Sequence, residues 1–168
     1  MLSLSRPLRA PWGPVETNLL MLAVLIAVAI VGPMVWRVDP TRMDIAGRFA
    51  GSSWLHPLGQ DDFGRDVLSR LMHGARISLV VAFATAVVAG VIGTLAGIVG
   101  GFFGRIWEFL TLRVSDVLLS FPPILLALMV VALFGPSAVT LIACLSLLYM
   151  PGFARVAYGE TLSITQME

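Results

Sequence analysis

Four long apolar segments alternate with charged stretches along the chain. Residues 19–36 contain no charged side chain, and at about 1.5 Å per helical residue they extend roughly 27 Å, close to the hydrocarbon thickness of a bilayer. Residues 77–99 are equally free of charge, and residues 117–134 and 138–153 form two further apolar segments, each containing proline. The pattern therefore predicts four transmembrane helices.

Two other interpretations of these segments fit the pattern less well. Core helices of a soluble protein carry a polar stripe with a period of 3.6 residues, which these segments lack. A cleaved signal peptide has an apolar core of about 7 to 15 residues followed by a small-x-small site, whereas residues 19–36 are longer and no such site follows. We therefore expect a retained anchor and an all-α, polytopic helical bundle embedded in the membrane.

Composition supports the membrane assignment and excludes several partners. Of 168 residues, 58% are hydrophobic and 12% are charged, against about 25% charged in an average soluble domain. The eleven basic residues, all Arg, nearly balance ten acidic ones, so we expect no nucleic-acid partner. A single Cys144 and two distant histidines, His56 and His73, give neither a disulfide framework nor a recognisable zinc-binding pattern.

The sequence offers no residues for catalysis or for binding a cofactor. The apolar segments hold no ionisable residue that could relay protons, and their hydroxyl groups have no His or Lys at the same depth to activate them. The glycines at 97–104 match no phosphate-binding motif, so the chain is not expected to bind ATP. We assign no catalytic, cofactor-binding or metal-binding residue, and we expect a protein that is not an enzyme.

Small residues and prolines suggest how the helices pack. Small side chains let membrane helices approach closely, and they recur at every fourth position of the second segment, with one change of phase. These expected packing residues are Ala82, Ala86, Gly90, Gly93, Gly97 and Gly101. Pro122 and Pro123 remove backbone donors near the start of the third segment and are candidates for a kink or a gate.

Charge counting does not decide which side of the membrane the chain ends face. If the N-terminus is inside, Arg6, Arg9, Arg105, Arg113 and Arg155 are cytoplasmic, whereas the long loop at 37–76 holds six Arg outside. That loop also contains five Asp residues, which leaves the two orientations nearly tied.

The loop at 37–76 has helical periodicity in its second half. From Asp62 onward, one face of the predicted amphipathic helix is apolar, and Asp66, Arg70 and His73 lie on the opposite, solvent-facing side. Asp61 or Asp62 is expected to cap the N-terminus of this helix.

Two ion pairs with i,i+4 spacing would stabilise this amphipathic helix. Asp61 with Arg65 and Asp66 with Arg70 have the favourable order, in which the acid comes first, and each pair is worth about 0.3 to 0.5 kcal/mol. From the residues alone, the segment is an interfacial helix joined by salt bridges.

The same loop carries a resemblance to a known family. The sequence HPLGQDDFGRDVLSRLMHGARISL resembles the HPLGTDxxGRDVLSRLxxGARxSL signature of the C-type inner-membrane permease subunit in dipeptide, oligopeptide and nickel ABC importers. The similarity continues through GTLAGIVGGFFGRIWEFLTLRVSDVLLSFPPILLALMVVALFGPS and LYMPGFARVAYGETLSI. Gln60 stands where Thr is usual, and the first fifty residues match only in pattern.

The resemblance implies a fold, an orientation and a set of partners. It implies the first four transmembrane helices of an ABC type I importer permease in the bacterial inner membrane, with the N-terminus in the cytoplasm. The implied partners are a second homologous permease subunit forming a heterodimer, two cytoplasmic ATPase subunits that bind the ATP, a periplasmic substrate-binding protein, and membrane lipid. Transport would proceed by alternating access between two membrane conformations.

This orientation divides the chain into a series of segments. Residues 77–168 correspond to the start of the family's transmembrane domain. The expected segments are a cytoplasmic tail (1–18), a first span (19–36), a periplasmic loop with its amphipathic helix (37–76), a second span (77–99), a cytoplasmic loop (100–116), a third span (117–134), a fourth span (138–153) and a cytoplasmic end (154–168).

The resemblance also raises an expectation about the end of the sequence. Family members continue past this point with the EAA coupling helix that contacts the ATPase, followed by two more spans. We therefore expect a chain that stops before the coupling helix, either because it is a partial or prematurely terminated product or because another polypeptide supplies the remainder. In both cases we expect that it does not transport on its own.

Two functions remain open at this stage. The first is an importer permease subunit for peptides or nickel, which forms part of the translocation path. The alternative is a membrane interaction or assembly protein, or an inert remnant, that keeps the helices without transporting. The signature residues expected to matter on the periplasmic face, either by holding the loop helix on the second span or by contacting the binding protein, are Gly59, Asp61, Gly64, Arg65, Asp66 and Arg70.

Overall fold

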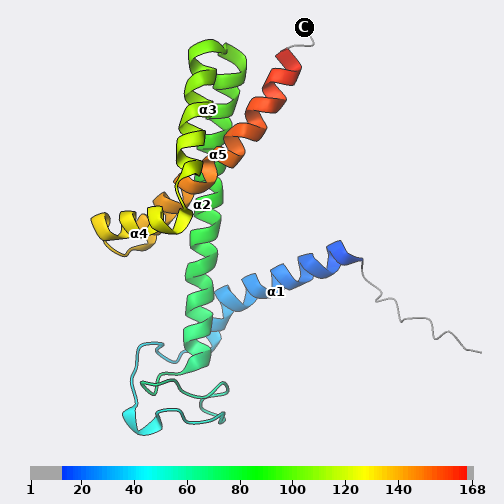
Figure 1. The fold of residues 1–168 in the computed structure, drawn as a ribbon. Helices are drawn as coiled ribbons and strands as arrows, with labels where there is room; N and C mark the ends of the chain where they lie inside the picture. Colours follow the sequence, from blue (N-terminus) through cyan, green and yellow to red (C-terminus); the bar gives the residue numbers. More distant parts are fainter. Residues whose placement is uncertain (1–12, 166–168) are drawn as a thin grey trace, which may run out of the picture. The chain divides into compact units, whose positions relative to one another are not determined.

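The computed structural model describes residues 13–165, and the secondary-structure elements of this range are helices (Figure 1). The elements are α1 (Pro14–Val35), the short 3-10 helix η1 (Ile45–Gly47), α2 (Val67–Phe103), α3 (Arg105–Ser120), α4 (Pro123–Phe134) and α5 (Ala138–Thr165). Helices α1, α2 and α5 are each long and apolar enough to cross a membrane, and the bent pair α3–α4 would make a fourth span. The all-α, polytopic membrane fold expected from the sequence is confirmed.

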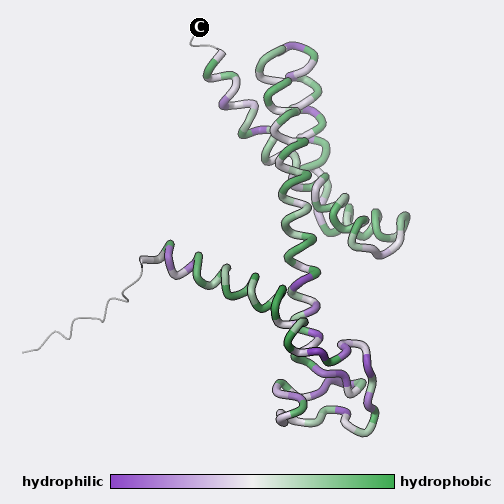
Figure 2. The backbone as a smooth tube through the Cα atoms, turned by 180° about the vertical axis from the view of Figure 1, so that it is seen from behind, coloured by the Kyte–Doolittle hydropathy of each residue, from purple (hydrophilic) through white to green (hydrophobic). Residues whose placement is uncertain are grey.

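The chain divides into two compact units, residues 1–79 and residues 80–168, and α2 runs from one into the other. Figure 2 shows that hydrophobic residues dominate the long helices, whereas hydrophilic residues gather in the loop between α1 and α2. Each unit is described separately below.

In the first unit, α1 is exposed along almost its whole length. Its apolar side chains are open to the surroundings, as expected of a helix that contacts lipid, and only Ala29 is fully buried. Gly32 lies against the side chain of Met72 in the first turns of α2, where a Cβ atom would come within 2.7 Å of the Met72 sulfur. A side chain at position 32 would therefore have to displace the Met72 side chain.

In the second unit, α2 packs on α5 through three glycines one helical turn apart. A Cβ atom at Gly93 would approach the Met150 carbonyl oxygen to 2.5 Å. A Cβ atom at Gly97 would come within 2.8 Å of the Ala157 Cβ, and one at Gly101 within 2.7 Å of the Thr161 Cβ. Helices meet this closely only where no side chain separates their backbones.

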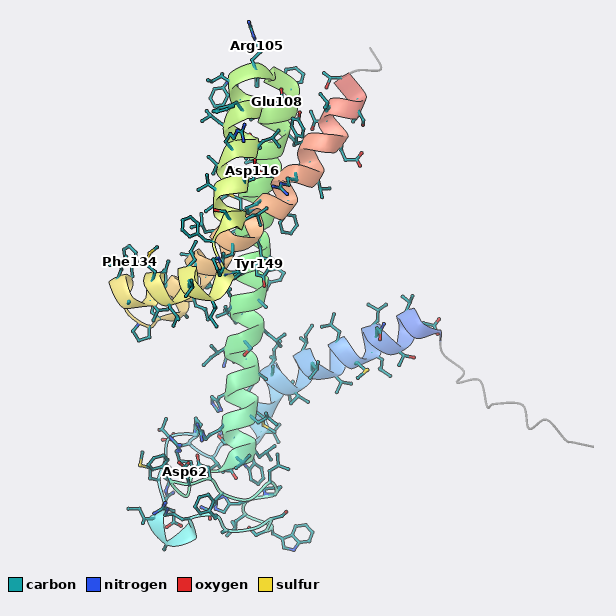
Figure 3. The ribbon with its side chains drawn as sticks, viewed as in Figure 1. Asp62, Arg105, Glu108, Asp116, Phe134 and Tyr149 are labelled. Atoms are coloured by element: carbon teal, nitrogen blue, oxygen red, sulfur yellow. The ribbon has the colours of Figure 1, made fainter. Side chains whose placement is uncertain are left out.

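Polar contacts join α3 to its neighbours within the second unit. The Tyr158 hydroxyl donates a hydrogen bond to a Glu108 carboxylate oxygen at 2.6 Å, and Arg155 pairs with Asp116 at 2.7 Å. Glu108 and Asp116 both lie on α3 (Figure 3). The Thr111 hydroxyl donates to the carbonyl oxygen of Ala96 on α2 at 3.0 Å. These contacts connect α3 with both α5 and α2.

The third predicted span, residues 117–134, is not one continuous helix. Helix α3 ends at Ser120 and α4 begins at Pro123, and the two helix axes differ by 89°. Pro122 and Pro123 cannot donate backbone hydrogen bonds, so the ladder of α3 cannot continue through them. The chain bends sharply at the proline pair, the position named from the sequence for a kink.

The other predicted segments lie within longer helices. Residues 77–99 occupy the middle of α2, which begins at Val67 and ends at Phe103. Residues 138–153 form the first part of α5, which continues through Pro151 to Thr165. The apolar pattern marks the stretch of each helix suited to lipid, whereas the helix itself continues into more polar sequence.

The glycine contacts predict how the second unit responds to one added methyl group. Gly97→Ala places a Cβ against α5 and should destabilise the helix pair by about 1–3 kcal/mol, whereas Gly74→Ala, on the same helix, meets no atom within 4 Å. Thermal unfolding in detergent, followed by circular dichroism, should show a lower midpoint for Gly97→Ala only. Equal midpoints for the two variants would contradict the packing.

Candidate functional site

The signature residues form a tight hairpin immediately before α2. Gln60 and Asp66 make an isolated antiparallel bridge. Inside it, the Asp61 N–H donates to the Arg65 carbonyl oxygen at 3.0 Å, and the Gly64 N–H donates back to the Asp61 carbonyl oxygen at 3.0 Å. Residues 61–65 therefore form a closed turn.

Two glycines allow this turn to fold against the rest of the loop. Gly59 and Gly64 have φ angles of +76° and +71°, a region that other residues rarely adopt. A Cβ at Gly59 would lie 2.7 Å from the Ala50 carbonyl oxygen, and one at Gly64 would overlap the Asp44 carbonyl oxygen. Both glycines are required by backbone conformation and by close approach to other backbone atoms.

Asp61 organises the interior of the turn. Its Oδ1 accepts hydrogen bonds from the Phe63 N–H at 2.8 Å and the Arg65 N–H at 2.9 Å, and its Oδ2 accepts from Arg65 Nε at 2.8 Å and from the Arg70 guanidinium. Burial raises the pKa of Asp61, but these hydrogen bonds and the Arg65 charge outweigh burial and lower that pKa to about 2. The carboxylate is therefore ionised at neutral pH.

Asp66 is the N-cap of α2 and lies almost completely buried, with 2% of its surface exposed. Its Oδ2 accepts from the Ser69 N–H at 2.7 Å and from the indole Nε1 of Trp36 at 2.9 Å, while its Oδ1 lies 2.9 Å from His56 Nδ1. Burial raises the pKa of Asp66, but the hydrogen bonds from His56, Ser69 and Trp36 lower it below its usual value.

The contacts of Asp66 join three parts of the first unit. Trp36 directly follows α1, His56 belongs to the middle of the loop, and Ser69 lies in the first turn of α2. The Ser69 hydroxyl adds a fourth connection by donating to the Val38 carbonyl oxygen. We call Asp66, Trp36, His56 and Ser69 the Asp66 cluster.

The structure corrects three expectations about this loop. The helix begins at Val67 rather than at Asp62, because residues 61–65 form the hairpin turn. Its N-cap is Asp66 and not Asp61 or Asp62, and Asp66 is buried rather than on the solvent-facing side.

The pairing of the charges also differs in part from the prediction. Asp61 does pair with Arg65, but across a turn instead of along a helix. In the described part of the chain, Arg70 pairs with Asp61, so the predicted pair of Asp66 with Arg70 is wrong. Asp66 caps the helix that carries Arg70, and its carboxylate is occupied by the other members of the Asp66 cluster.

All six signature residues named from the sequence lie in this hairpin or in the first turn of α2. Sequence reasoning missed Trp36 and Ser69 as partners of Asp66, and it singled out His56 only as a histidine outside a metal site. One signal was available: Ser69 is three residues after Asp66, the spacing at which an N-cap side chain reaches a backbone N–H. Trp36 and His56 carry no such local signal, because they are 30 and 10 residues away.

A cavity of about 470 Å³ opens beside the Asp66 cluster. Its wall is partly apolar and partly charged, and all of it comes from the loop. The lining residues are Val38, Arg42, Met43, Asp44, Leu55, His56, Gln60, Gly64 and Asp66. Within residues 13–165, no group of three His, Cys, Asp or Glu side chains is placed to hold a metal ion.

The remaining residues named from the sequence lie in the second unit. Gly93, Gly97 and Gly101 contact α5, as described above. Ala82 and Ala86 instead line an apolar groove of about 960 Å³ with Tyr149 of α5, and a Cβ at Gly90 would lie 3.8 Å from the ring of Phe153. Pro122 and Pro123 lie at the bend between α3 and α4, and gating there remains a prediction.

Comparison with known proteins finds related sequences over most of the chain, although no family model matches it. The chain is 34% identical over 151 residues to the dipeptide transport system permease protein of Alkalihalophilus pseudofirmus, covering 90% of this chain and 50% of that protein. It is 38% identical over 151 residues to the glutathione transport system permease protein of Escherichia coli strain UTI89, covering 89% and 50%.

A third relative is the di/tripeptide transport system permease protein of Pseudomonas aeruginosa strain UCBPP-PA14. The chain is 31% identical to it over 169 residues, covering 94% of this chain and 56% of that protein. The chain thus spans about half the length of the curated relatives it matches.

The geometry of the Asp66 cluster predicts a strong local effect of removing its carboxylate. Asp66→Ala leaves the Trp36 and His56 groups without an acceptor and removes the helix cap, which should cost the loop about 2–4 kcal/mol. Hydrogen–deuterium exchange should show faster exchange at the Ser69 amide and through the first turn of α2.

Asp62→Ala is the matched control. Asp62 is half-exposed and lies 3.6 Å from Arg65, so its removal should change local stability by less than about 1 kcal/mol. Unchanged exchange in Asp66→Ala, or equal acceleration in both variants, would refute the role assigned to Asp66.

Proposed function

Because the chain is homologous to the permease subunits of bacterial peptide transport systems, we propose that it is the membrane component of an ATP-driven importer of short peptides. The names of three relatives specify dipeptides, glutathione, and di- and tripeptides. None of these three names mentions nickel, which the signature sequence also allows. Peptides are therefore the preferred substrate class.

The proposed orientation places the N-terminus in the cytoplasm of a bacterial cell and the loop between α1 and α2 in the periplasm. Support comes from the resemblance of the loop to the family signature, because the six Arg and five Asp of residues 37–76 do not decide the side by charge. In this orientation, the turn between α2 and α3 and the end of α5 lie on the cytoplasmic side of the inner membrane.

The proposed partners would supply the rest of the translocation path, the ATP hydrolysis and the delivery of the peptide. A second permease subunit would complete the translocation path, two ATPases would supply energy from the cytoplasm, and a periplasmic binding protein would deliver the peptide. The observation that carries the proposal is the sequence similarity over 90% of the chain, since it includes the residues that build the Asp66 cluster and the glycine contacts of α2.

The polar contacts between α3 and α5 would let the two helices move together when the ATPase subunits act on the cytoplasmic side. Glu108 and Asp116 on α3 are joined to Tyr158 and Arg155 on α5, so displacement of one helix would be passed to the other. The bend at Pro122 and Pro123 then separates this paired region from α4. We therefore assign the proline pair as a hinge candidate within the proposed transport cycle.

A chimaeric permease tests the proposed function. The 151 matching residues of this chain would replace their counterparts in the Alkalihalophilus pseudofirmus dipeptide permease, expressed with the other subunits of that system. We expect ATP-dependent uptake of a labelled dipeptide, reduced at least about tenfold by Asp66→Ala because the loop loses its cap and its cross-links.

The same chimaera with Asp62→Ala should retain uptake. Expression levels in the membrane would be compared by immunoblot for all three proteins. A chimaera that is present at a normal level in the membrane but takes up no dipeptide would contradict the proposed function.

A further inference from the structure

The cavity in the loop between α1 and α2 carries charges that the hairpin itself does not use. Of its two carboxylates, Asp66 already accepts from His56, Trp36 and Ser69, so its charge is compensated within the protein. The Asp44 side chain accepts one hydrogen bond within residues 13–165, from the Ala46 N–H to its Oδ1 at 3.2 Å, and Asp44 lines the cavity.

The cationic side of the cavity is formed by Arg42. Arg42 is exposed and lines the cavity, and no ion pair to its guanidinium is recorded among residues 13–165. Asp44 is two residues away and lines the same cavity. The cavity therefore offers one cation and one anion from neighbouring positions.

The remaining lining residues suit an organic ligand better than a simple ion. Val38, Met43 and Leu55 provide apolar wall, and His56, which bonds Asp66 through Nδ1, has its Nε2 left for a ligand. A volume of about 470 Å³ lies within the range of small-molecule sites. A small anion would be repelled by the carboxylate of Asp44, and a small cation would be repelled by the guanidinium of Arg42.

We propose that this cavity binds a short peptide with both termini free, its carboxylate on Arg42 and its ammonium group on Asp44. Charge-assisted hydrogen bonds at both ends give orientation, and the apolar wall accommodates a side chain of the peptide. The assignment rests on the proposed function only in that peptides reach this face, and it places a peptide contact on the permease chain itself. Binding requires no ATP and no partner subunit.

Isothermal titration calorimetry on the full chain in lipid nanodiscs tests this site. The probe is alanyl-alanine, compared with N-acetyl-alanyl-alanine amide, which lacks both charges, and with free alanine. We expect saturable binding of alanyl-alanine, no detectable binding of the capped peptide, and weaker binding of alanine. Arg42→Gln and Asp44→Asn should each weaken binding of alanyl-alanine by about tenfold or more.

Two control variants change charge in the same loop outside the cavity. Arg48→Gln and Asp62→Asn should leave the affinity unchanged, because neither residue lines the cavity. Asp44→Asn keeps the oxygen that accepts from Ala46, and hydrogen exchange at the Ser69 amide would verify that the loop of each variant is folded.

Four results would each overturn the proposal. These are no saturable binding to the unmodified chain, equal binding of the capped peptide, equal or tighter binding of alanine, and unchanged affinity in folded Arg42→Gln. Failure of the chimaera to transport alongside intact binding here would reject the importer function alone. A chimaera that transports dipeptide, together with no saturable binding to the chain, would reject only this cavity as a peptide site.

Discussion

A buried carboxylate determines the structure of the first unit. Removing the Asp66 side chain from water carries a large cost unless its charge is met by hydrogen bonds, and here three donors meet it, from Trp36, His56 and the Ser69 N–H. These donors come from the end of α1, the middle of the loop and the start of α2. The hydrogen-bonded Asp66 carboxylate thus fixes where α2 begins, and it holds the first turn of α2 against the residues that follow α1.

The membrane-embedded contacts follow a different physical rule. Lipid provides no hydrophobic force between helices, so in their apolar segments α2 and α5 associate through close backbone approach at Gly93. The same kind of contact continues at Gly97 and Gly101, toward the more polar end of α5. Charged pairs occur in the loop hairpin and between α3 and α5, such as Arg155 with Asp116. The molecule therefore uses small residues where α2 meets α5 and charge-assisted hydrogen bonds in its more polar segments.

Local sequence patterns predicted much of this structure. Most of the features that they did not predict depend on contacts between residues far apart in the sequence. Uninterrupted apolar stretches predicted membrane helices, and glycine spacing predicted small-residue packing, because both signals are contained within one helix. The helical period from Asp62 was misleading, since Gly64 adopts a positive φ and Asp61 closes a turn. Burial of Asp66 depends on Trp36, 30 residues away, and no sequence periodicity reports such a contact.

A double-mutant cycle between Trp36 and Asp66 tests the central claim most directly. The free energy of unfolding would be measured for the unmodified chain, Trp36→Phe, Asp66→Asn and the double variant. If the indole and the buried carboxylate stabilise the loop through their hydrogen bond, the coupling energy should be about 0.5–3 kcal/mol in favour of the native pair. Additive effects, with a coupling energy near zero, would contradict the role given to Asp66.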